Sequence, residues 1–188
     1  RSTDQGKSWE LLRDDNYIIK IGPADTFYAT KKHGGIFYSQ DDGSSWNHFI
    51  GVPSNYLCGF GVDPQVSGQV YGISCSPASI FMNNEHSENW ENKYEPERSF
   101  SEDFSIYFDK TGVFVYALSG HELYRSIDRG ETWSSCEVEE ARRRGGKTLA
   151  IHPDDPNHLF IVNNKSEILE YVDGCHIARK INISPGIV

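Results

Sequence analysis

The chain has 188 residues, a net charge of −9 and an aromatic content of 13 %, including ten Tyr and ten Phe. This length is sufficient to bury the core of one compact domain, and the abundance of aromatic residues favours strands over helices. The acidic balance argues against nucleic acid or an anionic membrane surface as a general partner. No apolar run approaches the roughly 18–20 residues that are needed to span a bilayer.

An eight-residue pattern, S-x-D-x-G-x-[ST]-W, occurs at residues 2–9, 39–46 and 126–133. A weaker copy occupies residues 83–90, and each of the four tryptophans closes one copy. The tryptophans are separated by 37, 44 and 43 residues. A repeat of about 40–45 residues is typical of one four-stranded blade of a β-propeller.

The segments between these patterns are predicted to be strands, four in each repeat. The first half-unit is a strand, a turn and a strand within residues 2–12. The expected strands of the first two repeats are 17–21, 26–30, 35–39 and 46–50, then 57–62, 69–74, 79–82 and 90–94. Those of the last two repeats are 104–108, 113–118, 122–126 and the segment after Trp133, then 148–152, 158–162, 167–171 and 176–183. The sequence therefore predicts an all-β chain of antiparallel four-stranded blades.

We expect a single β-propeller domain or fragment over residues 1–188, with a half-blade at 1–13 and blades at about 14–51, 52–95, 96–139 and 140–184. About 4.5 blades are present, and the half-blade lacks its inner strands. A propeller closes by pairing its blades into a ring. The chain is therefore predicted to be part of a larger propeller, completed by further blades of the same parent chain or by a partner chain.

The residue types of the repeated pattern suit a tight turn between two strands. Asp accepts hydrogen bonds from nearby backbone N–H groups, Gly permits a positive φ, and the Ser/Thr hydroxyl closes a further local bond. The Trp ring buries apolar surface beside the turn. A structural role is thus predicted for Asp4, Gly6, Trp9, Asp41, Gly43, Trp46, Glu85, Trp90, Asp128, Gly130 and Trp133.

This pattern and its spacing resemble the Asp-box, or bacterial neuraminidase repeat, family of β-propellers. Its members include sialidases, xyloglucan-active glycoside hydrolases, sortilin-type sorting receptors and photosystem assembly factors. The resemblance implies that the Asp-box is a structural turn on the face away from the usual ligand site. It implies the fold without choosing a function.

The residues do not form a complete catalytic set. A sialidase needs three converging arginines, and no arginine opens a strand in the required manner, so that site is rejected. A glycosidase needs two carboxylates across a cleft; the acidic pairs 14–15, 102–103 and 139–140 fall in loops, where solvated charge is the simpler interpretation. The cysteines have no CxxC spacing and the histidines no metal-binding spacing, so neither a metal nor a cofactor is predicted.

Four cysteines are present, and Cys58 and Cys75 flank an expected hairpin. A hairpin centred on Val66 and Ser67 places these two cysteines opposite each other, within reach of a disulfide. Two buried free thiols are the alternative. Asn164 and Asn182 begin glycosylation sequons, and together with the candidate disulfide they favour a secretory or extracellular location.

If the chain binds a ligand, the loops opposite the repeated turns are the expected site, and the candidate residues there are His33, Tyr56, Arg98, Asp103, His121 and Arg142. The leading hypothesis is a non-catalytic binding scaffold or receptor ectodomain of sortilin-like character that recognises a protein or peptide. One alternative is a fragment of a glycoside hydrolase that acts on polysaccharide, in which case carbohydrate is the ligand. Another is an assembly factor of an organelle or bacterial envelope, which predicts reduced cysteines.

Overall fold

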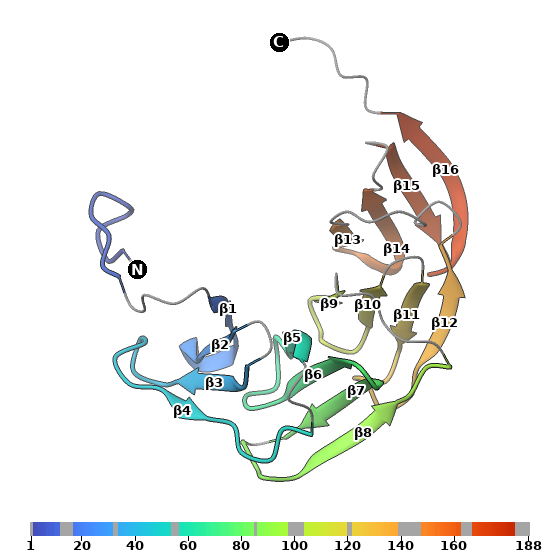
Figure 1. Ribbon diagram of the computed structural model, residues 1–188. Helices are drawn as coiled ribbons and strands as arrows, with labels where there is room; N and C mark the ends of the chain where they lie inside the picture. Colours follow the sequence, from blue (N-terminus) through green and yellow to red (C-terminus); the bar gives the residue numbers. More distant parts are fainter. Residues whose placement is uncertain are drawn as a thin grey trace.

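The computed structural model describes residues 2–11, 17–31, 34–53, 57–84, 86–97, 104–119, 122–138, 148–162 and 167–182. These residues form four antiparallel sheets of four strands each and a single 3₁₀ turn, η1 (Pro23–Asp25). The sheets follow one another as blades around an open arc, with blade 1 at one end and blade 4 at the other (Figure 1). The chain is thus an all-β partial propeller of four blades, which confirms the predicted fold class.

Each blade consists of four consecutive strands, and the first strand of each lies nearest the centre of the arc (Figure 1). Blade 1 contains β1 (Tyr17–Ile21), β2 (Phe27–Lys31), β3 (Ile36–Ser39) and β4 (Asn47–His48); blade 2 contains β5 (Leu57–Val62), β6 (Val70–Cys75), β7 (Ala78–Asn83) and β8 (Trp90–Tyr94); blade 3 contains β9 (Phe104–Phe108), β10 (Val115–Ser119), β11 (Glu122–Ser126) and β12 (Ser134–Glu137); blade 4 contains β13 (Thr148–His152), β14 (Asp155–Val162), β15 (Glu167–Val172) and β16 (His176–Asn182).

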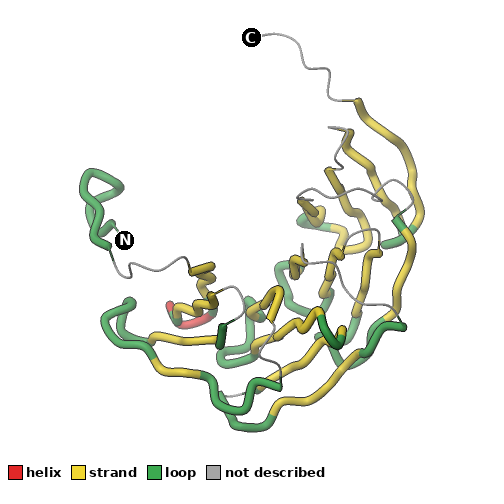
Figure 2. The backbone as a smooth tube through the Cα atoms, viewed as in Figure 1, coloured by secondary structure: helices red, strands yellow, loops and turns green. Residues whose placement is uncertain are grey.

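The predicted strands within residues 2–12 are wrong for the described part of that segment. Residues 2–11 form a turn without an assigned strand (Figure 2). Trp9 is 77 % exposed and Leu11 is 78 % exposed, whereas the sequence predicts a buried Trp. The reason is that a strand needs a paired neighbour, and no described strand lies beside this segment.

The core lies between successive blades. Blades 1 and 2 share one apolar cluster that includes Phe49 and Phe60, and blades 2 and 3 share another that includes Ile80 and Ile106. A third cluster joins blades 3 and 4. Both faces of blades 2 and 3 are therefore covered, and their middle strands β6, β7, β10 and β11 carry buried apolar residues on both sides.

A buried tyrosine on the second strand of blades 1, 2 and 3 is bonded to the next blade. Tyr28, Tyr71 and Tyr116 are each 0 % exposed. Tyr28 Oη accepts from Gly68 N at 3.2 Å, Tyr71 Oη donates to Arg129 O at 2.6 Å, and Tyr116 Oη donates to Pro156 O at 2.8 Å. A buried hydroxyl needs such a partner, so these bonds fix the position of each blade on its neighbour.

We call residues 2–9, 39–46 and 126–133 the tryptophan turns, and all three have the same hydrogen bonds. In the third turn, Gly130 N donates to Ser126 Oγ at 2.7 Å, and Ser126 Oγ donates to Asp128 Oδ1 at 2.8 Å. Thr132 donates to Asp128 through its N–H at 2.9 Å and through its hydroxyl at 2.6 Å. Trp133 Nε1 donates to Gly130 O at 2.9 Å. The carboxylate thus organises the turn.

The electrostatics of the turns follow from these bonds. In the second turn, hydrogen bonds from the Ser45 hydroxyl, the Ser45 N–H and the Ser39 hydroxyl lower the pKa of Asp41 to about 2. The equivalent Ser8 and Ser2 groups lower the pKa of Asp4 to about 2. Both carboxylates are therefore ionised at neutral pH, as acceptors of several donors must be.

The weaker copy at residues 83–90 uses different bonds. Asn83 Nδ2 donates to Ser87 O at 2.7 Å and to Asn89 O at 2.9 Å. Trp90 Nε1 donates to Ile50 O of blade 1 at 3.0 Å rather than to its own turn. The predicted position Glu85 lies outside the described residues.

Two disulfides are present. Cys58 and Cys75 are joined as predicted, with a Cα–Cα distance of 5.9 Å, but the hairpin register differs from the expected one. Val62 pairs with Val70, and the register shifts between Leu57 and Gly59, so that Cys58 lies at an irregularity. The difference arises because Asp63 N donates to Gln69 O and closes the turn one residue earlier than expected.

The second disulfide, Cys136–Cys175, was not predicted from the sequence. It has a Cα–Cα distance of 6.1 Å and joins β12 of blade 3 to the turn that precedes β16 of blade 4. Its partners are 39 residues apart, so the pairing depends on how two blades are packed rather than on a local hairpin.

The turn network predicts that Asp128→Ala destabilises the chain. The substitution leaves the Ser126 hydroxyl and both Thr132 donors without their acceptor, and bonds to charged groups contribute about 1–3 kcal/mol. Chemical denaturation should show a loss of that size. Asp154→Ala removes only an exposed ion pair with Lys110 and should change stability by under about 1 kcal/mol. Equal losses in the two variants would contradict the assigned role.

Removal of the second disulfide is predicted to destabilise blade 4 more than the other blades. Cys136→Ser with Cys175→Ser should lower stability by about 2–5 kcal/mol, because the closed loop in the unfolded chain is released. Limited proteolysis should then cut blade 4 before the other blades. Unchanged proteolysis of blade 4 would show that the apolar cluster alone holds it.

Candidate functional site

All six residues that the sequence nominates for ligand binding lie outside the described residues. These are His33, Tyr56, Arg98, Asp103, His121 and Arg142. The glycosylation candidate Asn164 also lies outside them, and Asn182 is the last residue of β16. These assignments therefore stay predictions, and the site described below is built from other residues.

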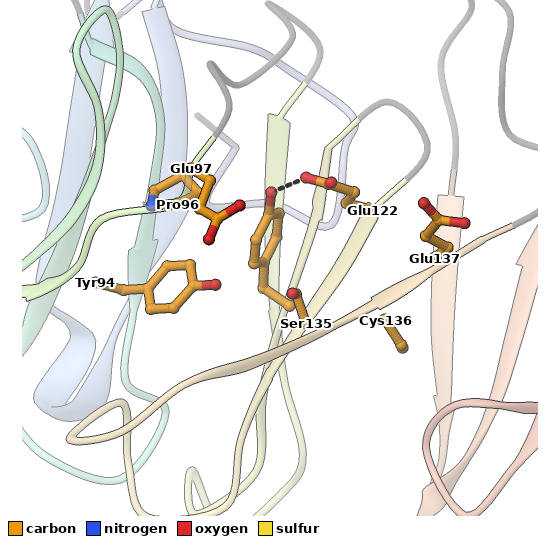
Figure 3. A pocket seen from close by; sticks show the side chains of 8 residues that line it. Tyr94, Pro96, Glu97, Glu122, Ser135, Cys136 and Glu137 are labelled. Atoms are coloured by element: carbon orange, nitrogen blue, oxygen red, sulfur yellow. Dashed lines mark hydrogen bonds between the residues drawn. The ribbon is translucent and has the colours of Figure 1, made fainter.

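A cavity of about 400 Å³ lies between the outer strand of blade 2 and the two outer strands of blade 3 (Figure 3). Residues from β8 and the segment after it form one wall, and residues from β11 and β12 form the other. The lining residues are Tyr94, Pro96, Glu97, Glu122, Tyr124, Ser135, Cys136 and Glu137. We call this cavity the acidic pocket.

The strand register explains why these side chains meet. Glu122 is the first residue of β11 and Glu137 is the last residue of β12, and the two are directly paired, as are Tyr124 and Ser135. Directly opposed residues share one face, with Cβ atoms about 4.5–5.5 Å apart. The strand ends therefore place two carboxylates and one tyrosine on a single face of blade 3.

The pocket lies at the edge of the blades opposite the tryptophan turns. Those turns connect the third and fourth strands of a blade, whereas Tyr94 and Glu137 end fourth strands and Glu122 begins a third strand. Antiparallel pairing places such positions at the other end of the sheet. The sequence predicts this face as the ligand-binding one.

The lining is negatively charged. Glu97, Glu122 and Glu137 supply three carboxylates, and no Lys, Arg or His is among the lining residues. The Tyr124 hydroxyl donates to the Glu122 carboxylate, and the rings of Tyr94 and Tyr124 meet edge to face with centroids 5.5 Å apart. Like charges directly opposite each other on paired strands are destabilising.

This arrangement is suited to a cationic group. Carboxylates accept hydrogen bonds from an ammonium or guanidinium group, and aromatic rings attract cations to their faces. A metal ion is a poorer match, because the part of the chain that the structure describes contains no cluster of three or more His, Cys, Asp or Glu able to hold one.

The sequence did not reveal the acidic pocket. The acidic pairs visible in the sequence are neighbours in the chain, whereas Glu122 and Glu137 are brought together by strand pairing. The sequence does place an acidic residue at each end of the β11–β12 hairpin. These two residues can be recognised as a pair only once the register of the two strands is known.

A second charged cluster lies in blade 4 and is already satisfied. Glu170 is 8 % exposed; its carboxylate accepts from Arg179 Nε and lies 2.8 Å from His158 Nε2. The hydrogen bond from Arg179 lowers the pKa of Glu170 the most, and the hydrogen bond from His158 lowers it by a smaller amount. A carboxylate with both oxygens occupied is a structural ion pair rather than a free binding group.

The fold defines the class of protein as a partial β-propeller, and solved structures of other proteins have a similar fold. No family model matches the chain, and no curated protein matches it. Its structure is similar to an ancestral GH74 enzyme (TM-score 0.67, 14 % identity, 91 % of this chain) and to the GH74 enzyme of Niastella koreensis (TM-score 0.59, 12 % identity, 88 % of this chain). It is also similar to YCF48 bound to D1 peptide (TM-score 0.61, 19 % identity, 92 % of this chain).

These likenesses establish the fold alone, because the identities are low. The chain spans 24 % of each GH74 chain and 56 % of the YCF48 chain. The neighbours include both enzymes and a peptide-bound protein, so they do not select one activity. Among the described residues there is no helix with the length and apolar character needed to cross a bilayer.

Proposed function

We propose that this chain is a non-catalytic propeller scaffold that binds a protein or peptide and receives a basic side chain of that ligand in the acidic pocket. The observation that carries the proposal is the directly opposed pair Glu122 and Glu137. These carboxylates lie beside two tyrosines in a cavity without a basic lining residue.

A basic ligand would relieve the repulsion between the two opposed carboxylates of the sheet. Two opposed carboxylates cost stability in the free protein, and a bound ammonium or guanidinium group removes that cost while forming charge-assisted hydrogen bonds. A cavity of about 400 Å³ accommodates a long side chain. The net charge of −9 attracts a basic ligand at long range.

Two further observations support a binding role. YCF48 bound to D1 peptide has a similar fold, which supports a propeller of this kind as a peptide-binding scaffold. The two disulfides support an oxidising compartment, such as the secretory pathway or the extracellular space. They favour a receptor-like, sortilin-type scaffold over an assembly factor with reduced cysteines.

A glycoside hydrolase fragment is the second candidate, and the GH74 neighbours favour it. That reaction needs two carboxylates on either side of the scissile bond, one of which donates a proton. The acidic pocket offers carboxylates and aromatic walls, which also suit a sugar. The two candidates differ in the ligand's charge, because a neutral oligosaccharide gains nothing from relieving the Glu122–Glu137 repulsion.

The proposal predicts charge-selective binding. Capped twelve-residue peptides that carry one central Lys or Arg should bind, and a matched peptide with norleucine should bind at least about tenfold more weakly, since a hydrogen bond to a charged group contributes about 1.5–3 kcal/mol. Glu122→Gln should weaken the binding of the Lys peptide to a similar extent. Raising the salt concentration should weaken it further. Isothermal titration calorimetry provides the measurement.

The matched control is Glu88→Gln, which changes an exposed carboxylate on the opposite edge of blade 2 and should leave peptide affinity unchanged. Equal binding of the norleucine peptide, or unchanged affinity in Glu122→Gln, would contradict the proposal. Binding of neutral oligosaccharides that is abolished by Asp103→Ala would support the glycoside hydrolase instead.

A further inference from the structure

The outer strand of blade 3, β12, has one free edge. It is the last strand in the order of its sheet and pairs with β11 alone, and Figure 1 shows it on the outer rim of the arc. Among the backbone hydrogen bonds that the described residues form outside the sheets, none involves Ser134–Glu137. Because alternate residues of a strand direct their N–H and C=O groups to opposite edges, about half of these groups in β12 point away from β11.

The outer strands of the other blades have features that hinder the addition of a further strand. β4 is only two residues long, β8 carries Glu91 and Lys93, and β16 carries Arg179 and Lys180. Shortness and charge are the usual means by which edge strands avoid pairing with other chains. β12 reads Ser-Ser-Cys-Glu and has a single charge, at its last residue, so it is the least protected of the four edges.

β12 is also held firmly in place. The disulfide from Cys136 to Cys175 joins it to blade 4, and the Ser134 hydroxyl donates to the carbonyl of Arg125 on β11 at 3.4 Å. Ser134, Ser135 and Glu137 are nevertheless exposed. A surface that is fixed before binding loses little conformational entropy when a ligand is added.

The strand register brings this edge to the acidic pocket. Ser135 and Glu137 line the pocket (Figure 3), and they lie opposite Tyr124 and Glu122 of β11. A further strand that paired with β12 would continue both rows. One of its residues would lie opposite Glu137, and a residue two positions away would lie opposite Ser135 on the same face.

The two rows favour different side chains. A basic side chain opposite Glu137 forms a favourable cross-strand pair and extends toward Glu122, which lies one strand further in. An aromatic side chain opposite Ser135 adjoins the row of Tyr124, whose ring meets that of Tyr94. In an antiparallel strand the basic residue comes first and the aromatic residue follows two positions later.

We propose that the ligand is an extended peptide of the sequence basic-x-aromatic, which adds to β12 as a fifth, antiparallel strand of blade 3. All three pairings within blade 3 are antiparallel. The inference rests on the proposed function, because the basic residue is the one that the acidic pocket receives. Backbone hydrogen bonds to an exposed edge supply affinity in such complexes, and side-chain pockets supply specificity.

A second copy of the chain is a poorer occupant of this edge. If its own β12 paired there, the added strand would be Ser134–Glu137, which contains no basic residue to lie opposite Glu137. The partner is therefore a separate peptide segment that carries the complementary charge.

Backbone methylation of the peptide tests the inference by calorimetry. A capped, threonine-rich peptide with a Lys-Thr-Phe centre should bind at least about threefold more tightly than its Phe-Thr-Lys isomer, which loses one cross-strand pair. N-methylation of alternate residues in one phase should weaken the Lys-Thr-Phe peptide at least about tenfold, because hydrogen bonds to β12 are lost. N-methylation in the other phase, the matched control, should change the affinity less than about twofold, since those amides point to solvent.

Hydrogen exchange of the protein gives an independent readout. Saturation with the Lys-Thr-Phe peptide should slow exchange of the outward amides of β12 and leave those of β8 unchanged. Equal effects of the two methylation phases, or unchanged exchange in β12, would overturn strand addition, while continued selectivity for Lys over norleucine would leave the proposed function standing. Failure of every basic peptide to bind would overturn both. A concentration-dependent dimer that the peptide dissociates would show that a second copy occupies the edge, and would also overturn the inference.

Discussion

The hydroxyl of Tyr71 donates to the carbonyl of Arg129 at 2.6 Å, from the second strand of blade 2 into the turn of blade 3, and the arrangement of the blades depends on contacts of this kind. Arg129 has φ 57°, and Gly130 after it has φ 80°. A side chain at Gly130 would collide with the Tyr71 ring. Gly130 thus serves both the turn and the approach of the preceding blade's tyrosine.

The same junction places blades 2 and 3 beside each other at the acidic pocket. Arg129 Nη1 lies 2.9 Å from Asp63 Oδ2, a carboxylate with no exposed side-chain surface, and Gln65 Nε2 donates to Lys110 O at 2.9 Å. These bonds lie at the tryptophan-turn edge, and the pocket lies at the other edge of the same two blades. Removing one partner of a buried ion pair is costly, so these bonds stabilise the contact between the two blades that form the walls of the pocket.

Local features of the fold could be predicted from the sequence. The turn bonds of Asp128 span four residues, and the cysteines at 58 and 75 flank one hairpin, so residue type and spacing were sufficient. The Cys136–Cys175 bond and the Glu122–Glu137 pair could not be predicted, because they depend on blade packing and on strand register. The exposure of Trp9 was also missed, since a turn motif does not show whether its own blade is complete.

Propellers of this type are stabilised mainly between neighbours, as in other repeat proteins. Hydrogen exchange of Tyr71→Phe, with Tyr94→Phe as the control, tests this claim most directly. We predict faster exchange in β5–β12 and a stability loss of about 1–3 kcal/mol from the unpaired Arg129 carbonyl, with blades 1 and 4 little changed and the control unaffected. Unchanged exchange, or an equal increase in all four blades, would contradict the account.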